Sequence, residues 1–270
     1  MTNSPVRSDW QWQEWQGRRY LTCSLLQDWQ HGFFTQDFYP DVPEILVTVL
    51  QPQATVFRVK QVHGDRLLTP TEIQQAKSTG ENEESWPAAD GIISDQSQQA
   101  VWVASADCTP VLVGDRVTGR VSAIHAGWRG TAQKIVPKAI QRFLALGSQL
   151  SHLRIAMGPA IAGSVYQVDQ DVAAEVGASL FLDDPKPPTE ILEILANLTE
   201  PPILSDPEAG KVRLDVRRIN ALQLDQLGLQ PDQIAIAPYC TYQIPEHFFS
   251  YRRTKEKKVQ WSGIMSGQGK

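Results

Sequence analysis

Short runs of apolar and β-branched residues alternate with polar, proline-containing stretches along most of the chain. Such runs are typical of β-strands, whereas polar stretches with glycine and proline indicate exposed loops. The runs predict strands at 45–50, 55–62, 100–105, 110–115, 120–125, 234–240, 248–253 and 259–265. The polar stretches predict loops at 71–89, 183–189 and 199–210.

Residues 131–147 have apolar positions at helical spacing and predict the first helix. Gly130 or Thr131 is expected to cap its N-terminus, and Gly147 is expected to end it. Pro137 lies inside this segment, where a proline removes a hydrogen bond and kinks a helix.

Residues 214–229 form the clearest amphipathic pattern, with Asp215 as the expected N-cap and Gly228 as the expected stop. Strands therefore predominate, and helices are scattered among them. This order predicts an α+β fold with mixed β-sheets and flanking helices rather than a doubly wound parallel sheet.

Composition narrows the function classes. The net charge of −5 argues against a general nucleic-acid binder, which usually carries a basic excess. No apolar run approaches the roughly 18 residues that a membrane span needs, and the N-terminus lacks the apolar segment of a signal peptide. The three cysteines are too sparse for a disulfide framework. We therefore expect a cytoplasmic protein that binds neither nucleic acid nor a membrane.

The candidate chemistry lies around a predicted hairpin. Two apolar strands flank the turn GDRVTG at 114–119, and a hairpin centred on Val117 places Cys108 almost opposite Ala126. Cys108 and His125 then lie side by side at the open end, where opposed Cβ atoms are about 5 Å apart. A thiolate and an imidazole at this separation can share a zinc ion, or they can act as a nucleophile and its base.

His63 is a third candidate, because it ends a predicted strand just before the Gly64-Asp65 turn. Three protein ligands with an open position are the catalytic form of zinc coordination. No cysteine or histidine recurs at the spacing of a local zinc motif, however. On these residues alone, simple packing or surface exposure stays an alternative.

Three arginines and one aspartate could complete a site. Glycines bracket Arg129 in HAGWRG (125–130), so this turn could receive an anion or could simply carry a surface arginine. Arg252 and Arg253 lie on a predicted strand, where successive side chains face opposite ways and at most one reaches a given site. Asp107 could orient a histidine, hold a substrate hydroxyl, cap the strand or relay a proton.

With these residues in place, the chain resembles the YfiH-like laccase-domain family, formerly described as multicopper polyphenol oxidases. The resemblance implies a single YfiH-like domain at 31–270, with residues 1–30 as an N-terminal extension packed on it. The matching segments follow the family order: HGFFT (31–35), VKQVHG (59–64), ADG (89–91), ADCTPVLV (106–113), SAIHAGWRG (122–130), GPAI (158–161), LDVRRINALQLDQLG (214–228), YCT (239–241) and FFSYRR (248–253).

The resemblance implies a zinc site formed by His63, Cys108 and His125, which would be the catalytic centre. It also implies purine nucleoside phosphorylase activity on adenosine, inosine or guanosine with phosphate, often with adenosine deaminase and methylthioadenosine phosphorylase activities. The expected partners are therefore small molecules, namely purine nucleosides and phosphate. The chain is expected to be a monomer or a homodimer. The remaining site residues are expected to hold phosphate or, for the aspartate, to relay a proton: Arg129, Arg252, Arg253 and Asp107.

Other functions remain open at this point. A Cys–His hydrolase or deamidase would use Cys108 as its nucleophile without a metal. A copper-dependent polyphenol oxidase would need histidines for several coppers, and the chain has five histidines in all. A non-catalytic interaction protein is the third alternative.

The chain also departs from the family pattern in three places. Gln36 replaces an arginine, Gln167 replaces a glutamate, and residues 254–262 replace the usual Thr-Gly-Arg. These departures bear on substrate range more than on metal binding.

Overall fold

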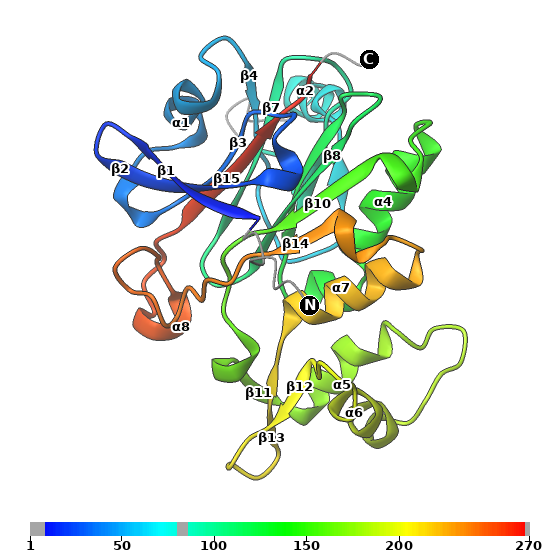
Figure 1. Cartoon of the computed structure of the whole chain (residues 1–270). Coiled ribbons are helices and arrows are strands. Elements are labelled where there is room, and N and C mark those ends of the chain that lie inside the picture. The colour runs from blue at the N-terminus through cyan, green and yellow to red at the C-terminus, as the bar shows by residue number, and fades with distance from the viewer. Residues whose placement is uncertain (1–8, 80–85, 268–270) are drawn as a thin grey trace, which may run out of the picture.

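The computed structural model describes residues 9–79 and 86–267, and mixed β-sheets form its centre (Figure 1). Two six-stranded sheets pack face to face, and a third sheet of three strands lies at one end of the molecule. The first sheet consists, in spatial order, of β1 (Trp10–Trp15), β2 (Arg18–Cys23), β3 (His31–Phe34), β15 (Gln260–Met265), β7 (Gln99–Ser105) and β4 (Thr55–Phe57).

The second sheet is built around the predicted hairpin. Every residue of its two central strands is buried, which fits strands covered on both faces. One face shares a core with the first sheet, where Leu112 and Ala123 cluster with Val101 and Val103. The strands of the second sheet, in spatial order, are β14 (Ile234–Ile236), β10 (Leu153–Met157), β8 (Thr109–Asp115), β9 (Val121–Ala126), β6 (Gly91–Ile93) and β5 (Leu67–Leu68).

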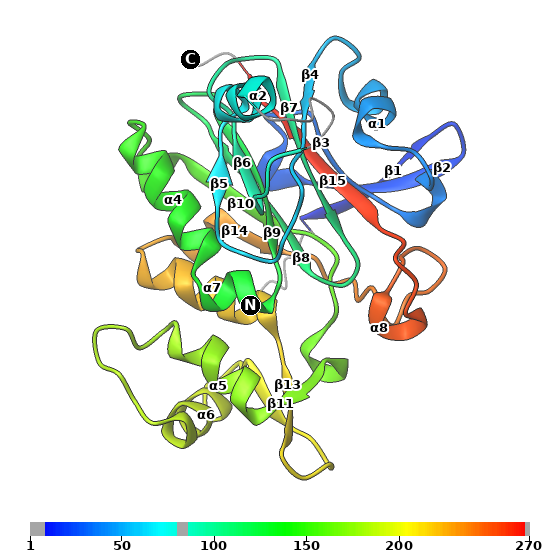
Figure 2. The ribbon, with the colours of Figure 1, turned by 180° about the vertical axis from the view of Figure 1, so that it is seen from behind.

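Helices cover the outer faces. Seen from behind, α4 (Ile135–Ala145) and α7 (Val216–Gln226) lie on the second sheet (Figure 2), and Phe143 and Leu224 belong to its outer core. The third sheet packs against α5 and α6 in a core of its own. Its parts are β11 (Gln167–Asp169), β13 (Lys211–Leu214), β12 (Ile203–Ser205), α5 (Gln170–Ala178) and α6 (Pro188–Ala196).

The remaining elements are short. The helices are α1 (Pro43–Leu50), α2 (Pro70–Thr79), α3 (Trp128–Ala132) and α8 (Tyr251–Thr254). Within residues 9–79 and 86–267, the 3-10 turns cover Ser24–Leu26, Gln36–Phe38, Leu150–His152, Gly163–Val165 and Pro231–Gln233. No helix among the described residues has the length and apolar character needed to cross a membrane.

The predicted α+β class with mixed sheets is confirmed, and so are the strands at 100–105, 110–115, 120–125 and 259–265. The predicted strands at 55–62 and 234–240 shorten to β4 and β14, and the predicted loop at 199–210 contains β12. The helix at 214–229 is also confirmed, since the Asp215 carboxylate accepts the Arg217 and Arg218 amides and Gly228 has a φ of +90°.

Two predicted strands are helices instead. Residues 45–50 belong to α1, because Pro43 lies in its first turn and Leu46, Val47 and Leu50 form one buried helical face. Residues 251–253 of the predicted strand 248–253 belong to α8, where the Ser250 hydroxyl caps the helix by accepting the Arg253 amide.

The predicted loop at 71–89 contains α2. The Thr69 amide donates to the Glu72 carboxylate over 2.6 Å, and the Glu72 amide donates to the Thr69 hydroxyl over 3.2 Å. This reciprocal pair stabilises a helix start despite the polar composition. Residues 80–85 of the same loop lie outside the described residues.

The single helix predicted at 131–147 is two helices. Lys134 adopts a left-handed φ of +61° between α3 and α4, and Gly127 rather than Gly130 or Thr131 is the N-cap. Pro137 therefore lies in the first turn of α4, where its missing amide breaks no helical hydrogen bond and causes no kink. Gly147 follows the end of α4 with a φ of +92°, as expected.

Residues 10–23 extend the first sheet as β1 and β2. Trp10 packs edge-on against Phe33, with ring centroids 5.1 Å apart. The domain boundary at residue 30 stays a prediction.

Candidate active site

Three side chains from separate elements meet at the open end of the β8–β9 hairpin. His63 lies in the connection between β4 and β5, Cys108 directly precedes β8, and His125 lies in β9. One ligand atom from each residue lies within 4.8 Å of the others. This is the only such group found among the described residues, and its donors are those that Zn²⁺ prefers.

The hairpin brings Cys108 to His125 through a register one residue away from the predicted one. Thr109 pairs with Ala126, so Cys108 lies opposite Gly127 rather than Ala126. A Cβ atom on Gly127 would lie 2.9 Å from the Cys108 sulfur, so a larger residue there would displace the sulfur from its position beside His125. The predicted proximity therefore holds despite the shifted register.

Asp90 connects two residues of the trio, His63 and His125, and was not a predicted site residue. Its buried carboxylate accepts the amides of Val62, His63 and Gly64 over 3.2, 2.9 and 2.7 Å. It also lies 2.9 Å from Nδ1 of His125. The prediction that His63 ends a strand is wrong. His63 lies in a turn with a φ of +62°, and the Asp90 carboxylate holds this turn. One side chain thus holds the backbone turn that carries His63 and contacts the imidazole ring of His125.

The trio carries complementary charges. Burial opposes ionisation of the Cys108 thiol, but His125 and His63 outweigh burial and lower the pKa of Cys108 to about 6. Burial disfavours the protonated His125 ring, but Cys108 and Asp90 raise the pKa of His125 to about 9. Near neutral pH, Cys108 is therefore largely a thiolate, which is the form that binds a metal or attacks an electrophile.

The trio opens into a cavity of about 790 Å³, which lies within the usual range of about 300–1,000 Å³ for small-molecule sites. One part of its wall is apolar and includes Val59, Trp261 and Val259. Another part is cationic and includes Arg129 and Arg252. The remaining lining residues are Gln61, His63, Ala104, Ser105, Ala106, Asp107, Cys108, His125, Trp128, Tyr166, Tyr251, Lys255, Glu256, Lys257 and Lys258.

Asp107 lines the cavity, but protein groups occupy both of its carboxylate oxygens. One oxygen accepts the Thr241 hydroxyl over 2.6 Å, and the other accepts the Arg252 amide over 2.8 Å. Asp107 therefore anchors the start of α8. This arrangement favours a positioning role over the predicted proton relay.

The two neighbouring arginines have different roles, although both lie on a helix rather than the predicted strand. Arg252 lines the cavity, donates to the Gln167 carbonyl over 2.8 Å and lies 4.8 Å from the Tyr166 ring centroid. Arg253 does not line the cavity. Its guanidinium donates to three backbone carbonyls, those of Thr241, Tyr242 and Phe248.

Arg129 follows the N-cap of α3 beside the trio. Its guanidinium lies 4.3 Å from the Trp128 ring centroid. Among the described residues it has no side-chain hydrogen bond or ion pair, and it lines the cavity. It can therefore donate to an anionic ligand without first breaking an internal contact.

Only one of the three departures from the family pattern reaches the cavity. The Gln36 side chain donates to the Pro245 carbonyl. The Gln167 side chain donates to Asp206 and Glu208, two carboxylates that a glutamate at this position would meet with repulsion. Residues 255–259, in contrast, form part of the cavity wall.

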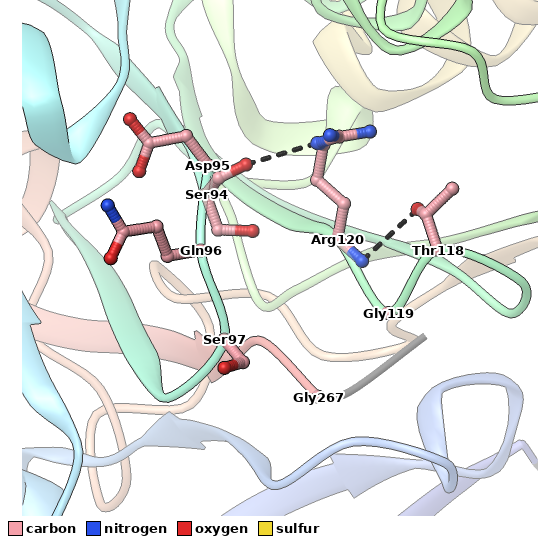
Figure 3. Close-up of a pocket in the computed structure, with 8 residues that line it drawn as sticks. All are labelled: Ser94, Asp95, Gln96, Ser97, Thr118, Gly119, Arg120 and Gly267. Carbon is pink, nitrogen blue, oxygen red and sulfur yellow. Dashed lines mark hydrogen bonds between the residues drawn. The ribbon is translucent and has the colours of Figure 1, made fainter. Parts of the chain in front are cut away.

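A second hollow lies at the opposite end of the hairpin, by its turn (Figure 3). It has a volume of about 320 Å³, and Arg120 crosses part of it to donate to the Ser94 carbonyl over 3.2 Å. None of the predicted site residues lines it. Its lining residues are Ser94, Asp95, Gln96, Ser97, Thr118, Gly119, Arg120 and Gly267.

Comparison with known proteins identifies the family of this chain. Residues 43–267 match the family described as multi-copper polyphenol oxidoreductase laccase. The chain is 58% identical over 258 residues to a Synechocystis protein named purine nucleoside phosphorylase. The aligned region covers 95% of this chain and 97% of that protein. The purine nucleoside phosphorylase YlmD of Bacillus subtilis is 30% identical over 206 residues, covering 76% and 68% of the two chains.

Solved structures show the same fold. YlmD from Geobacillus stearothermophilus superposes with a TM-score of 0.73 at 21% identity, covering 95% of this chain and 99% of that one. The hypothetical protein YfiH from Bacillus licheniformis gives a TM-score of 0.72 at 22% identity, covering 92% and 96%.

Proposed function

This chain belongs to the YfiH-like family described as multi-copper polyphenol oxidoreductase laccase, and on that premise we propose that it is a zinc-dependent purine nucleoside phosphorylase. The observation that carries the proposal is one cavity lined by the His63–Cys108–His125 trio and by two arginines, Arg129 and Arg252. The relative of 58% identity supports the activity by its name. Adenosine, inosine or guanosine and phosphate would be the substrates.

The donor set suits a single zinc ion better than several copper ions. One thiolate and two imidazoles lie close together, and Asp90 orients the His125 ring through Nδ1, as carboxylates commonly do for zinc-binding histidines. A multicopper oxidase needs further histidine clusters, and none occurs among residues 9–79 and 86–267. His31, for example, has both ring nitrogens in hydrogen bonds to backbone groups.

In phosphorolysis, a phosphate oxygen forms a bond to C1′ of the ribose while the bond from C1′ to the purine nitrogen breaks. The products are the free base and ribose 1-phosphate. Arg129 and Arg252 can hold the phosphate dianion through charge-assisted hydrogen bonds. Asp107 keeps Arg252 in place through its amide. Zinc at the trio would supply a Lewis acid that polarises a substrate oxygen or nitrogen.

A second candidate is a metal-free Cys–His hydrolase, which the low pKa of Cys108 favours. A thiolate beside a protonated imidazole is the resting pair of such enzymes. Adenosine deaminase and methylthioadenosine phosphorylase activities stay predictions from the family resemblance.

We expect about one zinc per chain in protein purified without added metal, together with phosphate-dependent release of adenine from adenosine. Elemental analysis and liquid chromatography of incubations with and without phosphate measure the two quantities. Removing the metal with a chelator should stop base release, and returning zinc should restore it. Stoichiometric copper with oxygen consumption, or full activity in metal-free protein, would contradict the proposal.

Asp90→Asn is expected to weaken zinc binding about 10- to 100-fold, because the amide group that replaces one carboxylate oxygen faces N–H donors. This loosens both the turn that carries His63 and the contact with the His125 ring. Competition with a zinc chelator measures this affinity. Asp65→Asn is the matched control, since Asp65 follows the same turn but pairs with Lys138 outside the cavity. Equal zinc affinity in the two variants would show that Asp90 serves the fold alone.

A further inference from the structure

We propose that the segment 255–258 forms a second anion subsite at the cavity, which binds a phosphoryl group in addition to the one held by Arg129 and Arg252. The inference deepens the proposed function and rests on the same cavity. It concerns a segment in which this chain departs from its family, so it assigns a property of this chain rather than of the family.

The cavity is cationic although the chain is acidic. The net charge of the chain is −5, yet five cationic side chains and two carboxylates line this cavity. Clefts lined by one sign of charge concentrate ions of the opposite sign. The cations are Arg129, Arg252, Lys255, Lys257 and Lys258, and the carboxylates are Asp107 and Glu256.

Besides Arg129 and Arg252, which are assigned to the first phosphate, two of these cations are not neutralised by a neighbour. Lys258 forms an ion pair with Glu256 over 2.8 Å, and Asp107 is occupied by Thr241 and the Arg252 amide. Among the described residues, the ammonium groups of Lys255 and Lys257 have no ion pair and no hydrogen bond. Their charge is therefore available to a ligand in the cavity.

The segment is held in place at both ends. At one end, the Lys255 amide donates to the Tyr251 carbonyl over 2.8 Å, and Asp107 anchors α8. At the other end the chain enters β15, where the Gln260 side chain accepts the Phe249 amide over 2.9 Å (Figure 1 shows α8 leading into β15). Lys255 itself has a left-handed φ of +61°, a conformation that glycine adopts far more readily.

The charges match a second phosphoryl group. A purine nucleoside is neutral, and two arginines already balance one phosphate dianion. Two further ammonium groups suit another phosphate, which lysine binds as a point charge. The phosphoryl group can come from the substrate, as the 5′-phosphate of a nucleotide, or from inorganic phosphate drawn into the cavity.

The test is calorimetric titration of the zinc-loaded protein with adenosine, adenosine 5′-monophosphate and inorganic phosphate at low ionic strength. We expect the monophosphate to bind about tenfold more tightly than adenosine, because each ammonium near a phosphate contributes a factor of about five in water before screening. Lys255→Gln/Lys257→Gln should lose this preference and keep its affinity for adenosine.

The control variant Lys60→Gln/Lys186→Gln removes the same number of positive charges from positions outside the cavity, and it should keep the preference for the monophosphate. Thermal unfolding of both variants verifies that each is folded. In wild-type protein, the preference for the monophosphate should also fall as potassium chloride is added, which tests the charge contribution without any substitution.

Two results support the subsite and distinguish its ligand. Loss of monophosphate affinity in Lys255→Gln/Lys257→Gln assigns the subsite to a nucleotide phosphate. In the second result, wild-type protein shows no preference for the monophosphate, while Lys255→Gln/Lys257→Gln loses affinity for inorganic phosphate in the presence of adenosine. This result assigns the subsite to free phosphate. Unchanged affinity for both anions in this variant overturns the proposal. If wild-type protein binds these anions through the lysines but does not cleave adenosine, the proposed function fails while the subsite stands.

Discussion

His63→Ala is expected to lose bound zinc and to reduce phosphorolysis of adenosine by at least about a hundredfold. The remaining pair, Cys108 and His125, offers only two ligands, whereas catalytic zinc sites use three. The Lewis-acid contribution of a metal is worth several kcal/mol, and each 1.4 kcal/mol or so is a factor of ten in rate. Metal content and initial rates, both measured on the same preparation, give the result.

His152→Ala is the matched control, because His152 lies in a 3-10 turn before β10 and does not line the cavity. The variant pair also separates the two candidate functions. If His63→Ala loses zinc and keeps its activity, Cys108 acts as a metal-free nucleophile. Cys108→Ser would then abolish that activity, and the zinc enzyme is the wrong assignment.

The fold class and most central strands could be predicted from the sequence, because these strands are fully buried and read as continuous apolar runs. The failures have local causes. In α1, β-branched residues occupy a helix whose start is set by Pro43, and in α2 the Thr69–Glu72 capping pair stabilises a polar helix. In both cases, residues in or just before the first helical turn decide that a helix forms. The spacing of apolar residues contains no information about such capping interactions.

The site could be predicted where it depends on local pairing. Cys108 and His125 lie on one hairpin, and a one-residue error in its register still left them adjacent. Asp90 was missed because it reaches His63 and His125 across 27 and 35 residues of sequence. Its one signal was the matched ADG segment, which gives no role to the carboxylate.

The sequence predicted that at most one of Arg252 and Arg253 reaches the site, and only Arg252 lines the cavity. The predicted cause, a strand with alternating faces, was wrong, because the helix α8 places Arg252 at the cavity and Arg253 beside backbone carbonyls. The capping interaction of Ser250 with the Arg253 amide decides between the two geometries. Here a local capping interaction overrides strand propensity.

Arg129→Ala is expected to lower kcat/KM for phosphate about 10- to 100-fold while zinc content stays near normal. The guanidinium lines the same cavity as His125 and has no hydrogen bond or ion pair among the described residues, so its donors are available to the phosphate. Hydrogen bonds to charged groups contribute about 1.5–3 kcal/mol, which corresponds to this range of rates. Any deaminase activity uses water instead of phosphate and should change much less.

The measurement is liquid chromatography of adenosine and inosine incubations with and without phosphate. Arg116→Ala serves as the control, because Arg116 pairs with Asp28 near the hairpin turn, at the end of the hairpin away from Cys108. A selective loss of phosphorolysis in Arg129→Ala identifies the phosphate anchor. Base release that does not depend on phosphate, or equal loss of phosphorolysis and deamination, would show that Arg129 supports the site in general and that another group, with Arg252 the first to test, binds the anion.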